Sequence, residues 1–442
     1  MSETSSVPST RALFTYRRDD AATVTRIRLD AARPGTTPVQ QGVFGNFIEH
    51  LADVVYQVLW ANALQNPNLE RLAADNVMPP YWDTAGATAW LDTGGYVSPR
   101  FVRLSAPDGS LSQRIFLPTH RIRKYTLTFY ARAAGPGQIT VSLRAGDDKA
   151  GTGALLQQTT QAVSQTVWRK FTVHWTVTEG GLAKGQKARF FLNYSGGTDV
   201  DVDQVEIFPD DAVDGMDPDV IKLAREWNIP VLRLAGNFSS GYHWRDGVGP
   251  RLARPTYRNL AWRGVETNHF GTDEFLDFSH RIGAVPQIAA NAGDGTPEEA
   301  ADWVRYCNGK SERVPIWEIG NELYGGWQIG HTDAAGNAER FVKFRDAMRK
   351  ADPRIKIIAT GQGDEFLPGG LSHDLAWNEA LLRAAVANGG QAPDWLSIHP
   401  LVGLPGNLGN VGYAEKWDSA MAHPAFMDQT LLPALINQIQ SI

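Results

Sequence analysis

VPIWEIGNELYGGWQIG, residues 314–330, begins as a short apolar segment and then places an amide and a carboxylate, Asn321 and Glu322, where that segment ends. The apolar part is typical of a strand that is buried on both faces. A barrel of parallel strands explains the carboxylate, because such barrels carry their chemistry at the C-terminal ends of the strands. We therefore expect Glu322 to lie at the end of a parallel strand and to face a substrate.

From about residue 210 onward, strand and helix patterns alternate. Asp217 and Thr296 each place a capping side chain before a proline, which is a typical helix start. The apolar segments between helices are IPVLRLAGN (229–237), AVPQIAANAG (284–293), VPIWEIGNE (314–322), IKIIATGQG (355–363) and DWLSIHPLVG (394–403). This pattern predicts an α/β fold, a (β/α)8 TIM-type barrel, with its first βα unit at residues 40–67 and the remainder at residues 210–442. We count six strands, so we expect the barrel to be incomplete at its C-terminal end.

Residues 68–209 contain short segments of alternating polarity separated by Gly, Pro, Asp and Asn. They are SPRFVRLSA, LSQRIFLP, KYTLTFYARAA, GQITVSLRA, WRKFTVHWTV, KARFFLNYSG and DVDQVEIF. Alternation with a period of two predicts an antiparallel β-sandwich of about seven or more strands. Because barrel-type sequence flanks it, we expect an inserted domain whose ends, near Asn68 and Pro209, lie close together. Residues 1–39 are expected to contribute one strand, ATVTRIRLD, to an accessory sandwich.

The composition argues against several classes of partner. The sequence has 42 basic and 48 acidic residues, a net charge of −6, and no basic segment with interleaved aromatic residues, so we expect no nucleic-acid partner. It contains no apolar segment long enough to span a bilayer and no visible signal peptide. We therefore expect no membrane partner, and a location either in the cytoplasm or outside the cell after removal of a leader. The single cysteine, Cys307, excludes an intrachain disulfide and is expected to be buried.

Four long motifs occur in order: FGNFIEHLADVVYQVLWANALQNPNLE, VLRLAGNFSSGYHWRDGVGPRLARP, LAWRGVETNHFGTDEFLDFSHRIGAVPQIAANAGDGTPEEAADWVRYCN and WEIGNELYGGWQIGH. Together they resemble glycoside hydrolase family 51, the retaining α-L-arabinofuranosidases of clan A. The resemblance implies release of terminal non-reducing α-L-arabinofuranosyl residues from arabinan, arabinoxylan or their oligosaccharides, without cofactor or metal, and it allows a homo-oligomer. The insertion resembles a family 4-type carbohydrate-binding module, with Tyr81, Trp82 and Trp90 as candidate stacking residues.

The resemblance also assigns roles to individual residues. Glu322 is implied as the acid/base, and Asn321 as the partner of the sugar 2-hydroxyl. An acid that donates near neutral pH needs a raised pKa, which we expect from an apolar pocket of Trp317, Ile319 and Trp327. The other implied substrate-binding residues are Glu49, Arg233, Asn237, Trp262 and His399. Structural roles are the alternatives: helix capping for Asn321 and Glu322, ion pairs for Glu49 and Arg233, and core packing for Trp262.

Three histidines, His50, His243 and His331, lack HxH or HExxH spacing. We expect them either to support neighbouring site residues or to be satisfied core side chains, rather than to bind a metal. Two positions depart from the family pattern. Leu234-Ala235 replaces an aromatic or Pro-Gly pair, and Pro400 follows His399 where the family has Arg-Tyr-Tyr. The family's tyrosine touches the nucleophile, and Tyr413 is its candidate replacement here. The substrate range therefore stays open.

A retaining mechanism needs a second carboxylate about 5 Å from the first. In the family this nucleophile lies in the seventh barrel strand. The sequence ends at Ile442 in a segment that resembles the preceding helix, so we expect the nucleophile to lie outside this sequence; Glu415 is the alternative within it.

Two other functions are weighed against the arabinofuranosidase. Clan-A barrels with the same Asn-Glu pair also cut β-glucans and xylans, so one alternative is an endo-acting β-glucanase or xylanase. The other alternative is a non-catalytic glycan-binding fragment. Hydrolysis of an aryl arabinofuranoside, compared with hydrolysis of carboxymethylcellulose, separates these functions.

Overall fold

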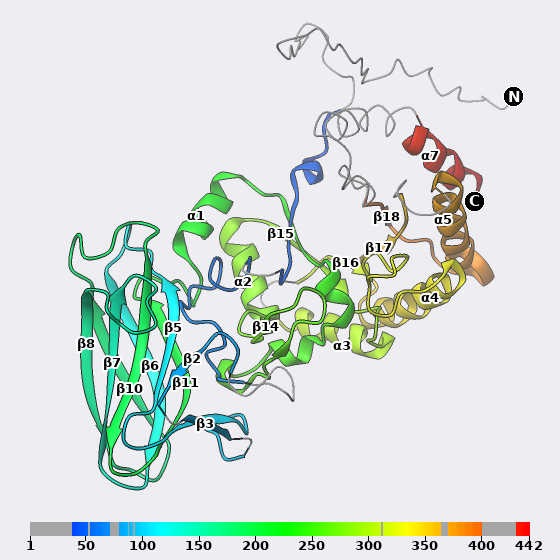
Figure 1. The fold of residues 1–442 in the computed structure, drawn as a ribbon. Helices are drawn as coiled ribbons and strands as arrows, with labels where there is room; N and C mark the ends of the chain where they lie inside the picture. The colour runs from blue at the N-terminus through cyan, green and yellow to red at the C-terminus, as the bar shows by residue number, and fades with distance from the viewer. Residues whose placement is uncertain are drawn as a thin grey trace, which may run out of the picture. The chain divides into compact units, whose positions relative to one another are not determined.

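The computed structural model describes residues 38–51, 54–70, 79–86, 88–91, 93–310, 313–363, 370–399 and 430–442 (Figure 1). The chain forms two compact units. We call Gly45–Pro286 the N-terminal unit, and Met1–Phe44 with Gln287–Ile442 the C-terminal unit.

Parallel strands followed by helices make up most of the described part of the C-terminal unit. The strands β15 (Val285–Ala290), which begins two residues before the unit boundary, β16 (Ile316–Ile319), β17 (Lys356–Thr360) and β18 (Trp395–Ser397) pair in parallel in this order. The helical segments are η1 (Gln41–Phe44), α3 (Pro297–Asn308), α4 (Ala334–Ala351), α5 (Gly370–Val386), η5 (Ala387–Gly389) and α7 (Leu432–Ser441). None of the helices in the described ranges is both long and apolar enough to cross a membrane.

The N-terminal unit begins with the same type of structure. Strand β1 (Asn46–Ile48) pairs in parallel with β12 (Val231–Leu234), and the sheet order is β1-β12-β15-β16-β17-β18. The helices are α1 (Pro218–Glu226), α2 (Thr272–Ile282) and the short η2 (Asn237–Gly241), η3 (Trp244–Gly247) and η4 (Arg251–Ala253); a hairpin joins β13 (Tyr257–Arg258) to β14 (Val265–Glu266). Six parallel strands with intervening helices form a partial TIM-type barrel, as predicted.

The predicted helix starts are confirmed. The Asp217 carboxylate accepts hydrogen bonds from the first turn of α1, and the Thr296 hydroxyl accepts one from the backbone N–H of Glu299 in α3. Pro218 and Pro297 occupy the first helical positions, where a missing N–H has no cost.

The helix expected in the first βα unit is absent from residues 54–70, which form turns and isolated bridges. The backbone N–H of Ala61 donates to the Gly215 carbonyl, and that of Ala63 donates to the Ile207 carbonyl, both at 2.8 Å. These N–H groups are therefore unavailable to a helix. The helix prediction is wrong because apolar spacing reports burial, whereas distant carbonyl groups determine the backbone hydrogen bonds here.

Two five-stranded antiparallel sheets occupy residues 83–209, which we call the two-sheet region. Their orders are β2-β5-β10-β7-β8 and β3-β4-β11-β6-β9. The strands are β2 (Asp83–Ala85), β3 (Thr88–Leu91), β4 (Phe101–Leu104), β5 (Ser110–Phe116), β6 (Lys124–Ala133), β7 (Gly137–Ala145), β8 (Leu155–Val163), β9 (Arg169–Thr176), β10 (Lys187–Gly196) and β11 (Val200–Pro209). The seven predicted segments are all strands. Three strands were not predicted. The strands β2 and β3 have only three and four residues, and β8, LLQQTTQAV, is a polar edge strand without clear apolar alternation.

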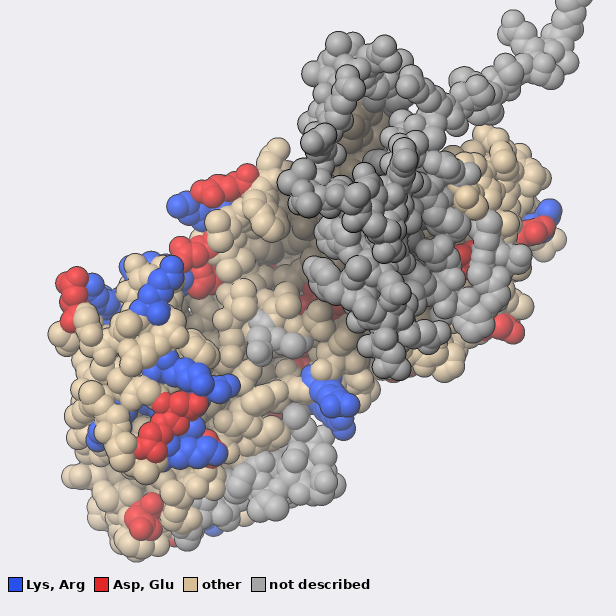
Figure 2. Space-filling view, turned by 45° about the horizontal axis from the view of Figure 1, so that its top comes forward, with Lys and Arg blue, Asp and Glu red and all other residues tan. Residues whose placement is uncertain are grey.

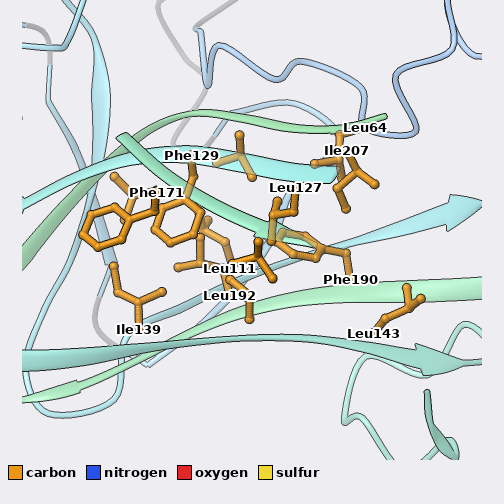
Figure 3. Close-up of a cluster of buried hydrophobic side chains, with 14 of the residues drawn as sticks. Leu64, Leu111, Leu127, Phe129, Ile139, Leu143, Phe171, Phe190, Leu192 and Ile207 are labelled. Atoms are coloured by element: carbon orange, nitrogen blue, oxygen red, sulfur yellow. The ribbon is translucent and has the colours of Figure 1, made fainter. Parts of the chain in front are cut away.

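The two sheets pack on a shared apolar core (Figure 3). Phe190 of β10 and Leu127 of β6 come from opposite sheets and are both fully buried. Phe129 and Phe171, from β6 and β9, stack with ring centroids 5.0 Å apart. This core explains the alternating burial along the edge strand β9, whereas the central strand β11 is buried over nearly its whole length.

The two ends of this region lie together, as predicted. The Val205 N–H donates to the Pro67 carbonyl at 2.8 Å, next to the contact between Ala63 and Ile207. The segment by which the chain enters the two-sheet region therefore lies beside β11, the last strand of that region.

Phe190→Ala tests whether the shared core stabilises the two sheets. The substitution removes a fully buried ring, and we expect it to lower the free energy of unfolding by about 3–5 kcal/mol. Val167→Ala, at a side chain that is 70% exposed, is the control and should change it by less than about 0.5 kcal/mol. Urea unfolding measures both, and equal effects would contradict the assigned core.

Candidate functional site

Glu322 lies just beyond the C-terminal end of β16, as predicted, on an unusual backbone. Gly320 has a φ of 81° and Glu322 a φ of 46°, both in the left-handed region. A side chain in this region costs about 1–2 kcal/mol, because its Cβ approaches the following carbonyl oxygen. Strained backbone of this kind concentrates at functional sites. The turn after β16 directs the Glu322 carboxylate toward donors from other segments.

Two ring N–H groups contact the Glu322 carboxylate. The Nε1 of Trp327 donates to Oε2 at 2.9 Å, and the Nδ1 of His399, just after β18, lies 3.0 Å from Oε1. The Glu322 side chain is 16% exposed and that of His399 is 22% exposed, so both remain reachable from solvent. His399 and Glu322 follow two different strands of the sheet, β18 and β16, and their side chains meet beyond the strand ends. The proposed sugar contact of His399 stays a prediction. Asn321, next to Glu322, is buried.

The environment lowers the pKa of Glu322 below its usual value. Burial alone raises the pKa, but hydrogen bonds from His399, Trp327 and Gln328, together with the charge of His399, lower it by more. The expectation of a raised pKa is therefore wrong for the described environment. In that expectation Trp327 supplied only apolar surface, whereas in the structure the indole N–H of Trp327 donates a hydrogen bond that stabilises the Glu322 carboxylate.

Trp317 and Ile319 do not form the expected apolar pocket. Trp317 is fully buried, and its ring meets that of Trp303 in α3 edge-on at 5.6 Å. Side chains alternate along a strand, so Ile319 lies on the same side as Trp317. Glu318, on the opposite side, is also fully buried; its carboxylate accepts hydrogen bonds from Ser397 at 2.8 Å and from Gln287 at 3.3 Å. Sequence reasoning missed this carboxylate.

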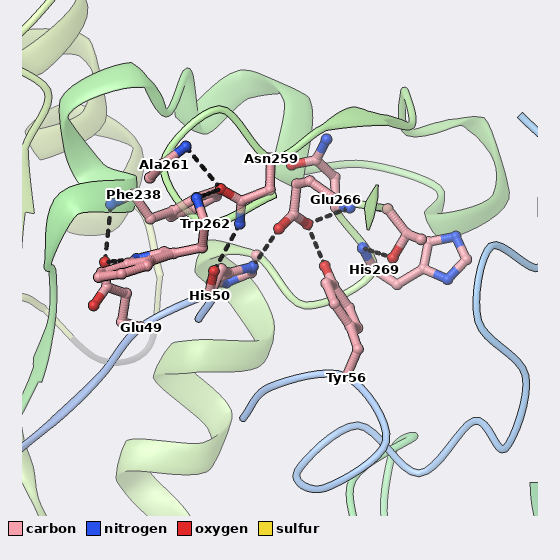
Figure 4. A network of polar contacts seen from close by, with 12 residues as sticks. Glu49, His50, Tyr56, Phe238, Asn259, Ala261, Trp262, Glu266 and His269 are labelled. Atoms are coloured by element: carbon pink, nitrogen blue, oxygen red, sulfur yellow. Dashed lines mark hydrogen bonds and ion pairs between the residues drawn. The ribbon is translucent and has the colours of Figure 1, made fainter. Parts of the chain in front are cut away.

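A second candidate site lies in the N-terminal unit and includes the predicted residues Glu49 and Trp262 (Figure 4). The Glu49 Oε1 accepts hydrogen bonds from the Phe238 backbone N–H at 3.0 Å and from the Trp262 Nε1 at 2.5 Å. Gly236, with a φ of 94°, makes this approach possible, because a Cβ there would lie 2.0 Å from the Glu49 carboxyl carbon. Glu49 is therefore buried in a fixed orientation.

A network of polar contacts links the segments that carry Glu49 and Trp262 to Asn259, His50 and Glu266 (Figure 4). Asn259 accepts from the Trp262 backbone N–H at 3.0 Å and donates to the His50 carbonyl at 2.7 Å. The His50 ring lies 2.6 Å from the fully buried Glu266, which also accepts from the Tyr56 hydroxyl. His50 is thus a satisfied buried side chain, one of the two predicted alternatives, whereas His243 is only partly buried and His331 is exposed. The sequence analysis did not identify Asn259 or Glu266 as part of a site. The only signal in the sequence is that GVETN contains an acidic residue, Glu266, for which the predicted fold gives no role.

The remaining predicted residues are placed as follows. Arg233 lies in β12 in register with Phe47 of β1, and Asn237 begins η2 directly after Gly236. Their proposed sugar contacts stay predictions. Tyr413 and Glu415 lie outside the described residues. The described residues contain no group of three or more His, Cys, Asp or Glu suited to a metal ion.

Residues 226–383 match the family model described as the alpha-L-arabinofuranosidase 1 domain. The probable alpha-L-arabinofuranosidase C of Aspergillus fumigatus is 39% identical over 165 residues, which cover 34% of this chain and 33% of the relative. An intracellular exo-alpha-(1->5)-L-arabinofuranosidase of Halalkalibacterium halodurans is 36% identical over 173 residues, 35% of each chain. The chain thus covers about a third of the length of these curated relatives.

Among solved structures, arabinose-bound MgGH51 α-L-arabinofuranosidase superposes with a TM-score of 0.62 over 81% of this chain and 74% of that chain. Their sequences are 17% identical, so this likeness bears on the fold alone. The family model covers Arg233, Trp262 and Glu322, so sequence similarity to α-L-arabinofuranosidases is shown for the segment that carries them.

Substituting His399 tests its effect on Glu322. His399→Ala removes a hydrogen bond to the carboxylate, so we expect the pKa of Glu322 to rise. Because the fold lowers this pKa, the contacts stabilise the folded state above the unfolded pKa of Glu322, and this stabilisation is lost as pH falls through the folded pKa. Carbon NMR titration of labelled glutamate measures the shift. His174→Ala, on β9, is the control; an unchanged Glu322 pKa in His399→Ala would refute the contact.

Gly236→Ala tests the close approach of Glu49. Gly249→Ala is a matched control, since Gly249 has a φ of 83° with open space around its Cβ position. We expect Gly249→Ala to cost about 1–2 kcal/mol of unfolding free energy from backbone strain. Gly236→Ala should cost about 1–3 kcal/mol more, because it displaces a buried, hydrogen-bonded carboxylate. Equal losses in urea unfolding would show that Glu49 does not require this glycine.

Proposed function

We propose that this protein is a retaining glycoside hydrolase that releases terminal non-reducing α-L-arabinofuranosyl residues from arabinan, arabinoxylan or their oligosaccharides. The observation that carries the proposal is the carboxylate of Glu322, which is partly exposed at the end of β16 and hydrogen-bonded by His399 and Trp327. The names of the similar proteins support this choice over an endo-acting glucanase or xylanase.

Glu322 would serve as both acid and base. In the first step its carboxyl group gives a proton to the glycosidic oxygen as the bond to the sugar breaks; in the second, its carboxylate removes a proton from water. The lowered pKa suits the base. To act as acid, Glu322 needs a second carboxylate nearby, since a like charge raises its pKa. Retaining hydrolysis requires that carboxylate as nucleophile, and we assign the role to no described residue.

Glu49, Asn237, Arg233 and Asn321 would bind the arabinosyl hydroxyls. Glu49 has the best-defined geometry, because two N–H groups orient one oxygen of its carboxylate. A carboxylate has about four acceptor positions, so these bonds leave capacity for a sugar hydroxyl. The two-sheet region would be an inserted carbohydrate-binding module. Trp82 cannot belong to its stacking platform, since its ring is buried and donates to the Asn66 carbonyl; the Trp90 side chain lies outside the described residues.

Glu322→Ala in the whole enzyme tests the acid/base role. Hydrolysis of substrates with poor leaving groups should fall by about 10²–10⁴-fold, and activated aryl substrates should lose far less, because they leave without a proton. Azide should partly restore turnover by attacking in place of activated water. Glu339→Ala, on the exposed side of α4, is the control. Equal losses on both substrate classes without azide rescue would rule Glu322 out.

A further inference from the structure

A cavity of about 390 Å³ in the N-terminal unit has Trp262 in its lining. Trp262 and Arg263 come from the loop between β13 and β14, and Tyr81 from the segment before β2. Arg114 and Phe116 come from β5 of the two-sheet region. The barrel part and the two-sheet region of this unit therefore line one cavity, which shares Trp262 with the Glu49 site.

The cavity continues along the two-sheet region. A second cavity of about 280 Å³ shares Gln65, Tyr81 and Arg114 with the first, and Lys149 and Arg189 also line it. We call the two cavities together the cleft. The shared lining residues place the two cavities next to each other on the two-sheet region.

Hydrogen bonds fasten the walls of the cleft to each other. The Gln65 N–H donates to the Gln113 side chain at 2.7 Å, and the Gln113 amide donates back to the Gln65 carbonyl at 2.9 Å. Asn68 donates to the Thr256 hydroxyl at 2.8 Å, linking the segment before the two-sheet region to the segment before β13. A cleft with fixed walls binds without a large cost of ordering.

The lining combines exposed aromatic rings with hydrogen-bonding groups. Trp262, Tyr81 and Phe116 are 37%, 43% and 51% exposed and are grouped around one cavity. Grouped exposed apolar surface of this kind marks a candidate binding site. Gln65 and Arg114 place an amide and a guanidinium among them. Apolar faces with a few polar groups are typical of binding sites for small molecules and sugars.

The charges of the cleft largely neutralise one another. Asp83 pairs with Lys149 at 2.6 Å and with Arg189 at 2.8 Å, and Asp147 pairs with Arg189 at 3.1 Å. In Figure 2, acidic and basic side chains likewise lie next to one another over the two-sheet region. The cleft therefore suits a neutral ligand better than a strongly charged one.

We propose that the cleft binds the neutral pyranose backbone of a polysaccharide whose arabinosyl branch enters the site at Glu49. A β-linked pyranose presents flat C–H faces to aromatic rings, whereas a furanose chain is puckered and flexible. The backbone would lie along Phe116, Tyr81 and Trp262, so the two-sheet region forms one wall of the substrate site. This assignment rests on the proposed function, because Glu49 is the residue proposed to bind the arabinosyl group.

Calorimetric binding of xylohexaose and of α-1,5-arabinohexaose to the protein tests the proposal. We expect xylohexaose to bind, and Phe116→Ala and Arg114→Ala each to weaken its binding about tenfold, the scale of one lost aromatic or guanidinium contact. Both side chains are more than half exposed, so the variants should fold. Leu155→Ala, 50% exposed on β8 of the same sheet, and Arg123→Ala are matched controls that should bind as the parent protein does.

Tighter binding of arabinohexaose than of xylohexaose would overturn the pyranose assignment. Unchanged xylohexaose binding in Phe116→Ala and Arg114→Ala would refute the proposal that the cleft is the binding site. Equally large losses of binding in the two control variants would also refute it. Hydrolysis of an aryl α-L-arabinofuranoside, measured separately, tests the proposed function. Binding needs no turnover, so either proposal can fail without the other.

Discussion

A buried carboxylate must find hydrogen-bond donors, and this requirement shapes both candidate sites. Glu49 accepts hydrogen bonds from a backbone N–H and an indole N–H. Glu266 contacts the Tyr56 hydroxyl and the His50 ring, and Glu322 contacts an indole and an imidazole. In most of these contacts the donor comes from a segment distant in sequence. The loops at the strand ends therefore take conformations that serve the carboxylates, including the left-handed backbone at Gly236.

The same requirement separates two kinds of acidic residue. Glu318 and Glu266 are fully buried and surrounded by protein donors, which suits a role in orienting neighbouring segments. Glu322 is partly exposed, so its carboxylate can meet a substrate as well as its protein partners. The lowered pKa of Glu322 follows from these partners and shows that apolar neighbours in the sequence do not establish a protonated acid.

The two-sheet region has its own core and also lines a cavity together with the barrel elements of its unit. Its core is its own, yet Arg114 and Phe116 of β5 line a cavity that reaches Trp262. The reciprocal hydrogen bonds between Gln65 and Gln113 keep β5 against the segment that enters the region. This arrangement allows the cleft and the Glu49 site to share one aromatic side chain, Trp262.

Local sequence determined the strands, the helix starts and the position of Glu322 after an apolar strand, because periodic burial, capping and strand ends depend on neighbouring residues. The polar edge strand β8 and the turns that replace a helix in residues 54–70 could not be predicted in this way. Only the tertiary structure decided which donors meet each carboxylate: Trp262 reaches Glu49 across 213 positions, and His399 reaches Glu322 across 77. Such contacts depend on the geometry of distant loops, and the pKa of Glu322 depends on them in turn.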